Sequence, residues 1–297
     1  MRRHGSKPTA EDGELRDIVI PVMGPTGAGK STFINALLQD ERLSVGHYLT
    51  SCTSELQVVE IESFPGNPPF NGRNLILVDT PGFNDTYEDD EKILHQIAEW
   101  LERAYRNSKM VLGGVIYLHD ISSDRFSGTA RRNLEIFQHF CGEAAFSKTV
   151  IGTTKWGRKA DDFSAMHEEE LRSVHWKSMI KKGSTVCRFL GDYESARSFV
   201  DVILRRMARD TALQIQVELA VDHKALADTK AGKGLRLHQI LELQAQILGL
   251  ETAVAVEDDE EAEQKLKMLR EKMQHLVKKV QDAKTPLPRR FRVFLGI

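Results

Sequence analysis

The chain has 297 residues, of which 41% are hydrophobic and 28% are charged, a composition that argues against disordered and collagen-like proteins. Its 41 lysines and arginines are balanced by 43 acidic residues, so no overall basic surface favours a nucleic acid partner. The three cysteines form no C-x-x-C pair, and residues 1–13 contain no apolar core of a secretory signal. We therefore expect a reducing, cytoplasmic location.

From residue 17 to residue 207, short β-branched runs alternate with longer amphipathic stretches, which predicts an α/β fold. We expect a flexible N-terminus over residues 1–16, followed by a mixed, mainly parallel six-stranded sheet between helices. The strands are expected at Asp17–Met23, Glu55–Glu62, Asn74–Asp79, Val111–Leu118, Thr149–Thr153 and Thr185–Leu190. Because Pro and Gly residues separate the second strand from the third, these two are expected to pair antiparallel at an edge.

Amphipathic helices are expected to cover this sheet, because hydrophobic residues recur at helical spacing in three stretches. The stretches are Ile93, Ile97, Leu101 and Tyr105; Leu134, Phe137 and Cys141; and Ala196, Phe199, Ile203 and Met207. We interpret them as faces that pack on the sheet rather than as cofactor contacts.

Beyond residue 207 the composition indicates a coiled-coil-like helical extension over residues 208–283. After Gly232 and Gly234, which we expect to break helical structure, hydrophobic residues step by three and four. The acidic run 257–263 interrupts this stepping, so the extension forms either an antiparallel hairpin or one interrupted helix.

The C-terminal tail, residues 284–297, contains four cations and no acids, with apolar residues between them. It is suited to weak contact with an anionic membrane or to docking back onto the protein.

A phosphate-binding motif follows the first expected strand directly. Gly24, Pro25, Thr26, Gly27, Ala28, Gly29, Lys30 and Ser31 match G-x-x-x-x-G-K-[ST], and we call residues 24–31 the phosphate loop. Its glycines allow positive φ angles, so that main-chain N–H groups and the next helix N-terminus can surround phosphates. Lys30 is then placed to reach the β- and γ-phosphates, Ser31 to bind Mg²⁺ and Thr32 to bond the α-phosphate.

A second motif, residues 75–82, is an apolar strand that ends on Asp79 and is followed by Thr-Pro-Gly. At the carboxyl end of the strand, Asp79 can hold Mg²⁺ through water, and the Gly82 N–H can sense a γ-phosphate. Together the two motifs predict a site for a purine nucleotide and Mg²⁺.

These motifs resemble the translation-factor-like branch of GTPases, whose D-x-x-G box often reads Asp-Thr-Pro-Gly. Leu49–Glu55, Gly114–His119 and Thr153–Trp156 are more closely similar to fungal G domain proteins of the septin and AIG1/Toc groups. The resemblance covers residues 17–207 and implies a P-loop NTPase G domain that binds GTP or GDP with Mg²⁺.

The resemblance also implies two switch segments, at residues 47–54 and 82–90. The first normally supplies a threonine that completes the Mg²⁺ shell and contacts the γ-phosphate. Thr53 is our choice for that residue, and Thr50 and Ser51 are the alternatives.

By the same resemblance, the base is read by Thr154, Lys155, Trp156 and Gly157, which we call the base-reading loop. The carboxylate that normally accepts two hydrogen bonds from guanine is absent, because Gly157 stands in its place, and the nearest acids are Asp161 and Asp162. Guanine preference is thus implied by the resemblance but not by the chemistry of the loop. Lys155 is expected beside the base, with Trp156 either on the base or in the core.

Ser195 and Ala196 resemble the loop whose main-chain N–H meets the guanine O6 atom. Phe83 stands where many GTPases carry a water-orienting Gln, so another group or a partner must assist hydrolysis. Arg125 is a candidate charge donor, to its own phosphates or to a neighbouring subunit.

We expect a slow, Mg²⁺-dependent GTPase that acts as a nucleotide switch through self-association. The homodimer contact is expected through the G domain or the C-terminal helices. Two alternatives stay open: a P-loop NTPase that also uses ATP, and a nucleotide-dependent dimerisation module with little or no turnover.

Overall fold

The computed structural model describes residues 16–43, 56–64, 70, 72–82, 87–123, 125–157, 161–207, 212–254 and 260–282. The chain divides into two compact units between His223 and Lys224. The expected domain end at residue 207 differs from this division, because α7 (Gln214–Gln216) and η3 (Val217–Val221) pack on helices of the first unit. None of the helices in the described ranges combines the length and apolarity needed to cross a bilayer.

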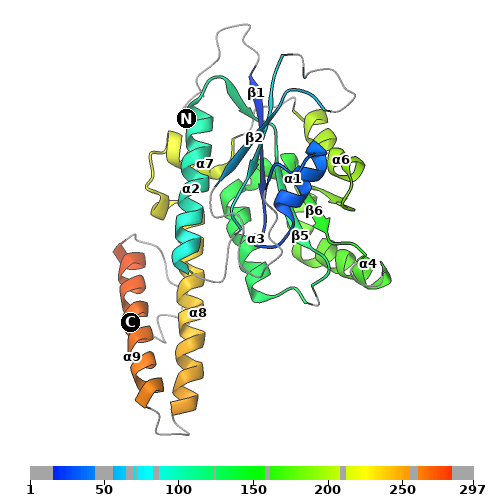
Figure 1. Cartoon of the computed structure of the whole chain (residues 1–297). Helices are drawn as coiled ribbons and strands as arrows, with labels where there is room; N and C mark the ends of the chain where they lie inside the picture. The colour runs from blue at the N-terminus through cyan, green and yellow to red at the C-terminus, as the bar shows by residue number, and fades with distance from the viewer. Residues whose placement is uncertain are drawn as a thin grey trace. The chain divides into compact units, whose positions relative to one another are not determined.

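The first unit is built around a seven-stranded sheet (Figure 1) with the order β2-β3-β1-β5-β6-β7, and β4 also pairs with β1. The strands are β1 (Asp17–Met23), β2 (Gln57–Ile61), β3 (Leu75–Asp79), β4 (Met110–Leu112), β5 (Val115–Asp120), β6 (Thr149–Thr154) and β7 (Thr185–Arg188). Only the β2–β3 pair is antiparallel, and every other pair in the described chain is parallel. The mainly parallel sheet with one antiparallel edge is therefore confirmed.

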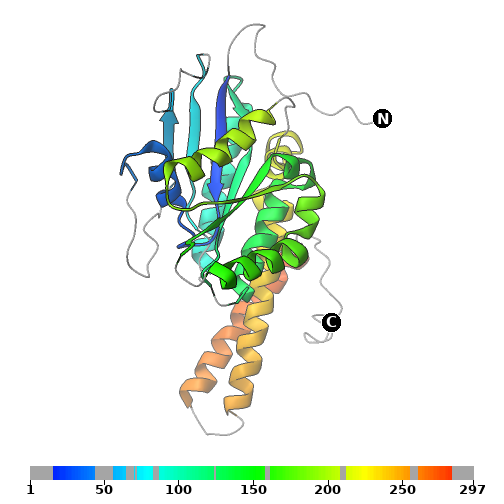
Figure 2. The same cartoon turned by 90° about the vertical axis from the view of Figure 1, so that its right-hand side faces the viewer.

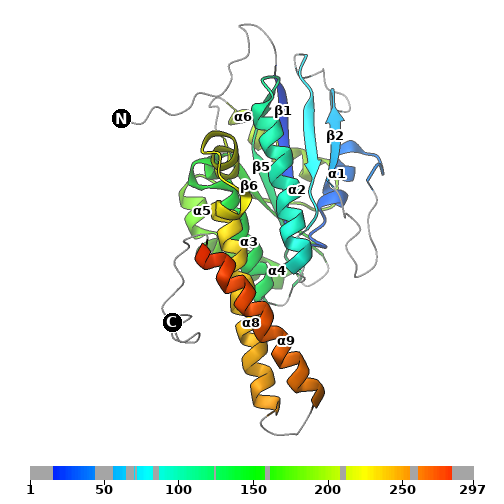
Figure 3. The same cartoon turned by 90° about the vertical axis from the view of Figure 1, so that its left-hand side faces the viewer.

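The helices of the first unit lie on both faces of this sheet, which Figure 2 and Figure 3 show from opposite sides. Besides α7 and η3, they are α1 (Lys30–Leu38), α2 (Tyr87–Arg106), α3 (Gly128–Cys141), η1 (Glu143–Lys148), α4 (Asp161–Glu170), η2 (Leu171–His175), α5 (Lys177–Lys181) and α6 (Tyr193–Arg205). Helices α1 and α6 cover one face, and α2 and α3 cover the other (Figure 1). The three expected hydrophobic stripes fall on α2, α3 and α6, and most of their residues are buried.

The main core lies between the sheet and the α1–α6 face. Ile20 and Val22 of β1 are fully buried there against Phe33 and Phe199, whose rings meet edge to face at 5.1 Å. Such a pair adds packing energy to the large apolar area that each ring buries. This core holds α1, and with it the phosphate loop, against the carboxyl ends of the strands.

The strand expected at Val111–Leu118 is wrong in its bounds, because Gly113 and Gly114 divide it into β4 and β5. A Cβ atom at Gly114 would stand 2.5 Å from the Lys148 carbonyl oxygen, so only glycine allows this approach. Beyond the break, β5 continues two residues further than predicted, to Asp120. This difference matters, because it places Asp120 at the functional edge of the sheet.

A buried ion pair joins α2 to α3. The guanidinium of Arg132 contacts the carboxylate of Asp90, and both side chains are almost fully buried. Removing one partner of such a pair typically costs about 3–5 kcal/mol, because the other charge stays buried without compensation. The first turns of the two helices are thereby fixed to each other.

The second unit consists of η4 (Leu226–Asp228), α8 (Lys230–Val254) and α9 (Glu260–Asp282). The two long helices lie side by side (Figure 1), with Ile240, Leu243 and Ile247 of α8 buried in one cluster with residues of α9. The sequence left two arrangements undecided, an antiparallel hairpin and one interrupted helix, and the structure shows the hairpin. The expected helix break at Gly232 and Gly234 is wrong, because the Thr229 hydroxyl accepts a hydrogen bond from the Gly232 N–H and caps α8 ahead of them.

Candidate nucleotide-binding site

The phosphate loop turns from β1 into α1 through three glycines with positive φ angles. The angles are 143° at Gly24, 75° at Gly27 and 87° at Gly29, a region that strains residues with a Cβ atom. Gly29 is the N-cap of α1 and supplies no side-chain cap, so the first main-chain N–H groups of the helix are left for a ligand. The partial positive charge of the helix N-terminus favours an anion there.

Lys30 folds back over this loop. Its ammonium group donates hydrogen bonds to the carbonyl oxygens of Gly24, at 3.1 Å, and Pro25, at 3.0 Å. Burial lowers the pKa of Lys30 to about 8, and the charge of Asp79 opposes this shift. A buried ammonium held only by carbonyl oxygens and one nearby carboxylate is well suited to bind a phosphate.

Ser31 and Asp79 bring together the two predicted Mg²⁺ ligands. The Ser31 hydroxyl donates to Oδ2 of Asp79 over 2.7 Å, and Asp79 is fully buried at the end of β3. Burial raises the pKa of Asp79, while the Ser31 hydrogen bond and the Lys30 charge act in the other direction. The other oxygen, Oδ1, is buried and has no hydrogen-bond partner among the described residues.

Gly82 packs directly on the phosphate loop. A Cβ atom at Gly82 would stand 2.4 Å from the main-chain nitrogen of Thr26, and the Thr26 hydroxyl donates to the Gly82 carbonyl oxygen at 3.2 Å. The close approach requires glycine and places residue 82 beside the loop that is expected to hold the phosphates. Thr32 lies exposed in the first turn of α1.

These groups fit Mg²⁺ and a nucleotide phosphate chain. A carboxylate oxygen and a hydroxyl oxygen are ligands that Mg²⁺ prefers, and the unpartnered Oδ1 of Asp79 is suited to accept from a metal-bound water. Ideal Cβ atoms at Gly27 and Gly29 meet nothing closer than 4.0 Å within the described chain, so space remains at the loop. Among the described residues, no group of three His, Cys, Asp or Glu side chains forms a separate metal site.

The base-reading loop is tied to the phosphate loop through Thr154. Its hydroxyl donates to the carbonyl oxygen of Ala28 at 2.8 Å and lies near the His119 carbonyl oxygen, at 3.3 Å. Both Thr154 and Ala28 are almost fully buried. The two loops expected to hold the base and the phosphates therefore form one connected structure.

Lys155 is held by an acid that sequence reasoning missed. Its ammonium group contacts Oδ2 of Asp120 at 2.5 Å, and its main chain has a φ of 61°. The Lys155 and Ser122 hydrogen bonds hold the pKa of Asp120 below its ordinary value against the effect of burial. The signal was the position of Asp120 at the carboxyl end of a parallel strand, which the predicted strand end at Leu118 concealed.

The Trp156 side chain contacts Thr153 of β6 and Arg188 of β7. Its indole N–H lies 3.1 Å from the Thr153 hydroxyl, and the Arg188 guanidinium stacks 4.3 Å from its ring centre. Arg188 in turn donates to the Glu168 carboxylate at 2.6 and 2.9 Å. Glu168 is buried and also accepts from the Thr153 hydroxyl at 3.1 Å, so a closed network supports the loop.

Ser195 and Ala196 lie in the first turn of α6. The Ser195 N–H donates to the Asp192 carboxylate at 2.8 Å, and the Ala196 N–H to the Asp192 carbonyl oxygen at 3.2 Å. The Ser195 amide is thus engaged by the helix cap, and the Ala196 amide forms the first main-chain hydrogen bond of the helix. Gly191, which has a φ of 93°, lies in the turn just after β7 and is closer in sequence to the end of that strand than Ser195 and Ala196 are.

Several predicted residues lie outside the described part of the chain. They are Thr53 with its alternatives Thr50 and Ser51, Phe83, and the basic tail 284–297. Arg125 is described and exposed, and it lines a cavity with Asp120 and His175. Asp162 is exposed at the start of α4, and Gly157, with a φ of 80°, carries no carboxylate.

The chain is similar to known GTPases over the part that carries this site. Residues 19–147 match the family described as 50S ribosome-binding GTPase. The small ribosomal subunit biogenesis GTPase RsgA of Trichormus variabilis is 37% identical over 94 residues, which are 30% of this chain and 24% of that protein. The chain thus spans about a quarter of the length of this curated relative.

The fold is also that of solved GTPase structures. A structure of the chloroplast translocon components atToc33 and psToc159 has a TM-score of 0.52 at 13% identity, over 67% of this chain and 86% of that chain. Toc33 from Arabidopsis thaliana in complex with GDP and Mg²⁺ has a TM-score of 0.50 at 14% identity, over 68% and 88%.

The first unit has the mixed α/β fold of P-loop GTPases, with a mainly parallel sheet, and a helical region follows it in the chain.

Proposed function

We propose that this protein binds GTP and GDP with Mg²⁺ and hydrolyses GTP slowly as a nucleotide switch. The observation that carries the proposal is the convergence of Lys30, Ser31 and Asp79 at the phosphate loop. Within the GTPases, the septin and AIG1/Toc groups are the proposed relatives, on the sequence resemblance given above. The proposed location is the cytoplasm.

The proposal gives each site residue a task. The N–H groups at the start of α1 and the Lys30 ammonium bind and orient the phosphates, and the carbonyl oxygens of Gly24 and Pro25 keep that ammonium at the loop. Ser31 and Asp79 hold Mg²⁺, which supplies charge neutralisation of the phosphate oxygens when bound. The Gly82 N–H and Thr53 contact the γ-phosphate, and loss of that phosphate releases both contacts.

We propose that hydrolysis is assisted by self-association, because Phe83 cannot orient water. For the chloroplast translocon components atToc33 and psToc159, dimerisation is important for the GTPase activity. In this chain Arg125 is the candidate donor of positive charge across a G domain contact, and the C-terminal helices are the alternative contact.

The experiment is a titration of nucleotide-free protein with labelled GTP and ATP in Mg²⁺, together with phosphate release over a range of protein concentrations. A higher affinity for GTP and a specific activity that rises with protein concentration support the proposal. An affinity for ATP equal to that for GTP contradicts the base assignment, and zero release at all concentrations contradicts the enzyme.

The second candidate is a P-loop NTPase with relaxed purine specificity. One observation favours it: Gly157 replaces the guanine-reading carboxylate, and the nearby Asp120 is already paired with Lys155. The same titration distinguishes the two candidates, and zero phosphate release together with nucleotide-dependent dimers favours the third, a dimerisation module.

A further inference from the structure

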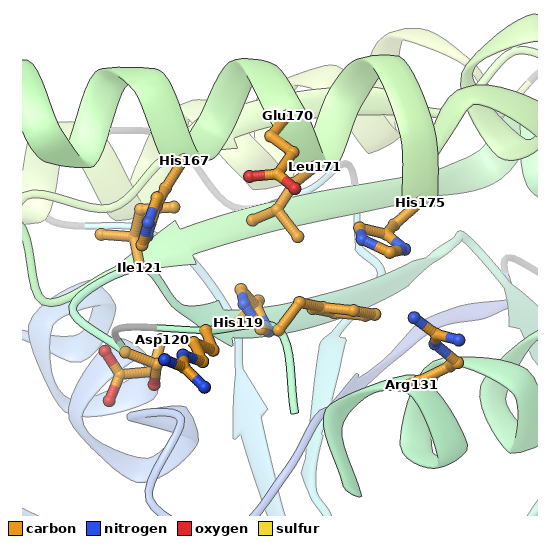
Figure 4. Close-up of a pocket in the computed structure, with 11 residues that line it drawn as sticks. His119, Asp120, Ile121, Arg131, His167, Glu170, Leu171 and His175 are labelled. Carbon is orange, nitrogen blue, oxygen red and sulfur yellow. The ribbon is translucent and has the colours of Figure 1, made fainter. Parts of the chain in front are cut away.

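A cavity of about 260 Å³ lies between the carboxyl end of β5 and the helical segment formed by α4 and η2. Figure 4 shows His167, Glu170 and His175 on one side of it, with His119 and Asp120 from β5 on the other and Arg131 of α3 at one end. Phe126 and Arg125, from the loop before α3, also line the cavity. The volume suits a small ligand, since it lies just under the usual range for drug-sized molecules.

This cavity is separate from the nucleotide site. No residue of the phosphate loop, and neither Ser31 nor Asp79, is among the described residues that line it. Three lining residues contact the base-reading loop: Asp120 pairs with Lys155, and the main chains of His119 and Ile121 form hydrogen bonds with Thr154.

The charges around the cavity favour an anion. Arg125 and Arg131 are exposed at its rim, and neither forms an ion pair with any described residue. Of the two lining acids, Asp120 is neutralised by Lys155, which leaves Glu170 against two guanidinium groups. The balance is therefore a net positive charge facing the space, where charge-assisted hydrogen bonds to an anion are strong.

The floor of the cavity carries a buried imidazole with no hydrogen-bond partner in the described chain. His119 is only 7% exposed, and its side chain makes no hydrogen bond within the described residues. Burial lowers its pKa to about 4, so the ring is neutral and offers one N–H donor and one acceptor. Its ring nitrogens are not among the fully buried atoms without a partner, so they reach the open space of the cavity, where a ligand or water can bond to them.

An aromatic wall stands beside this imidazole. The rings of Phe126 and His175 stack at 4.0 Å between centroids with 28° between their planes, and Phe126 lies 5.7 Å from His119. Such a wall favours a flat ring, which gains stacking as well as apolar contact.

We propose that this cavity is a second binding site, which takes a small aromatic anion, a carboxylate or a phosphate monoester. Arg131 binds the anionic group of the ligand, with Arg125 as the second cation. The aromatic ring of the ligand lies along Phe126 and His175, and the His119 imidazole forms a hydrogen bond with the ligand. The site does not depend on the nucleotide function proposed above.

The test uses the full chain with ¹⁵N-labelled histidines, with and without saturating GDP and Mg²⁺. Benzoate and phenyl phosphate are the two anionic probes, and uncharged benzamide is the matched control. We expect saturable shifts of the His119 and His175 side-chain signals with an anionic probe and none with benzamide. His95, exposed on α2 beside Glu99, is not expected to shift.

Arg131→Gln is the decisive variant and is expected to weaken binding of the anionic probe by about tenfold or more. Arg103→Gln, an exposed position on α2, is the matched control and is expected to bind the probe as the parent does. Denaturant unfolding establishes that both variants are folded. If Arg131→Gln does not fold, Arg125→Gln replaces it with the same expected loss.

Three outcomes overturn the proposal: no saturable shift with either probe, equal binding of benzamide, or equal binding by the Arg131→Gln and parent proteins. Preference for benzoate or for phenyl phosphate decides which anion the site takes. Because the titration is also run without nucleotide, failure of GDP to bind leaves this test intact.

Discussion

The hydroxyl of Ser31 donates a hydrogen bond to one carboxylate oxygen of Asp79 over 2.7 Å, while the second oxygen of that carboxylate is buried and unpartnered among the described residues. Ser31 lies in the first turn of a helix and Asp79 ends a strand, and the parallel pairing of β1 with β3 brings them together. Two oxygen ligands are thus already in place for a divalent cation that prefers oxygen.

Ser31→Ala is expected to remove the Mg²⁺ dependence of nucleotide binding. The affinity for GTP in Mg²⁺ should fall by about tenfold or more, because one ligand of the cation is lost, while the affinity in EDTA should stay the same. Ser198→Ala, which removes an exposed hydroxyl on α6, is the matched control. Equal loss of affinity in Mg²⁺ and in EDTA would count against a metal role for Ser31.

Lys30→Ala is expected to lower the affinity for GTP and GDP by roughly a hundredfold or more, because a buried ammonium that binds phosphate is removed. Calorimetry measures the affinity, and thermal unfolding checks the fold. Lys109→Ala, at an exposed lysine before β4, should bind as the parent protein does. Retained affinity in Lys30→Ala would exclude the phosphate loop from binding.

Arg188→Met is expected to release Trp156, since the guanidinium that stacks on the indole is lost and buried Glu168 loses two hydrogen bonds. We expect the GTP affinity to fall by about tenfold, while the affinity for inorganic tripolyphosphate, which has no base, stays unchanged. Arg172→Met is a close control, because Arg172 also approaches Glu168, at 3.8 Å, but does not stack on Trp156 within the described chain. Equal losses of affinity for GTP and for tripolyphosphate would show that Arg188 stabilises the fold and does not act through the base-reading loop.

His119 should make the first unit sensitive to acid. Its pKa is about 4 in the folded protein and near 6.5 in the unfolded chain, so the unfolded chain binds the proton first as the pH falls. The free energy of unfolding should therefore be unaffected by this group above pH 6.5 and should fall by about 2–3 kcal/mol between pH 6.5 and 4.5. Denaturant titrations of the parent and of His119→Gln measure this difference. A parallel decrease in both proteins would refute it.

Ile247→Ala is expected to weaken the α8–α9 hairpin by about 2–4 kcal/mol, since Ile247 is almost fully buried between the two helices. Leu248→Ala is the matched control, because the neighbouring Leu248 is 46% exposed. Hydrogen exchange of the helix amides measures the loss, and nucleotide affinity should not change in either variant. Light scattering on the same samples tests whether the hairpin carries self-association.

The sequence predicted the parts of the fold that follow from local pattern. The motif of Lys30 and Ser31 is contiguous, and the end of β3 at Asp79 follows from an apolar run, so both were found. The partners of the base-reading loop were not, because Asp120 and Arg188 approach Lys155 and Trp156 only through the order of the strands, and Glu168 reaches Arg188 from helix α4. The break of β5 from β4 was missed for a similar reason, since the crowding at Gly114 comes from Lys148 on another segment.

In the C-terminal helices, the prediction was wrong because it followed local propensity alone. Gly232 and Gly234 were expected to break helical structure on propensity, but a capping hydroxyl at Thr229 and the close passage of Leu226 over Gly232 outweigh it. A Cβ atom at Gly232 would stand 2.2 Å from the Leu226 carbonyl oxygen, so this glycine serves packing.

The ion pair between Asp90 and Arg132 limits how far a rearrangement at Gly82 can spread along the chain. Asp90 lies eight positions after Gly82, and shifting it relative to α3 would mean separating two buried charges. Rearrangement that starts at Gly82 therefore meets a fixed anchor within the first turn of α2. Beyond that anchor, the helix can respond only by moving together with α3.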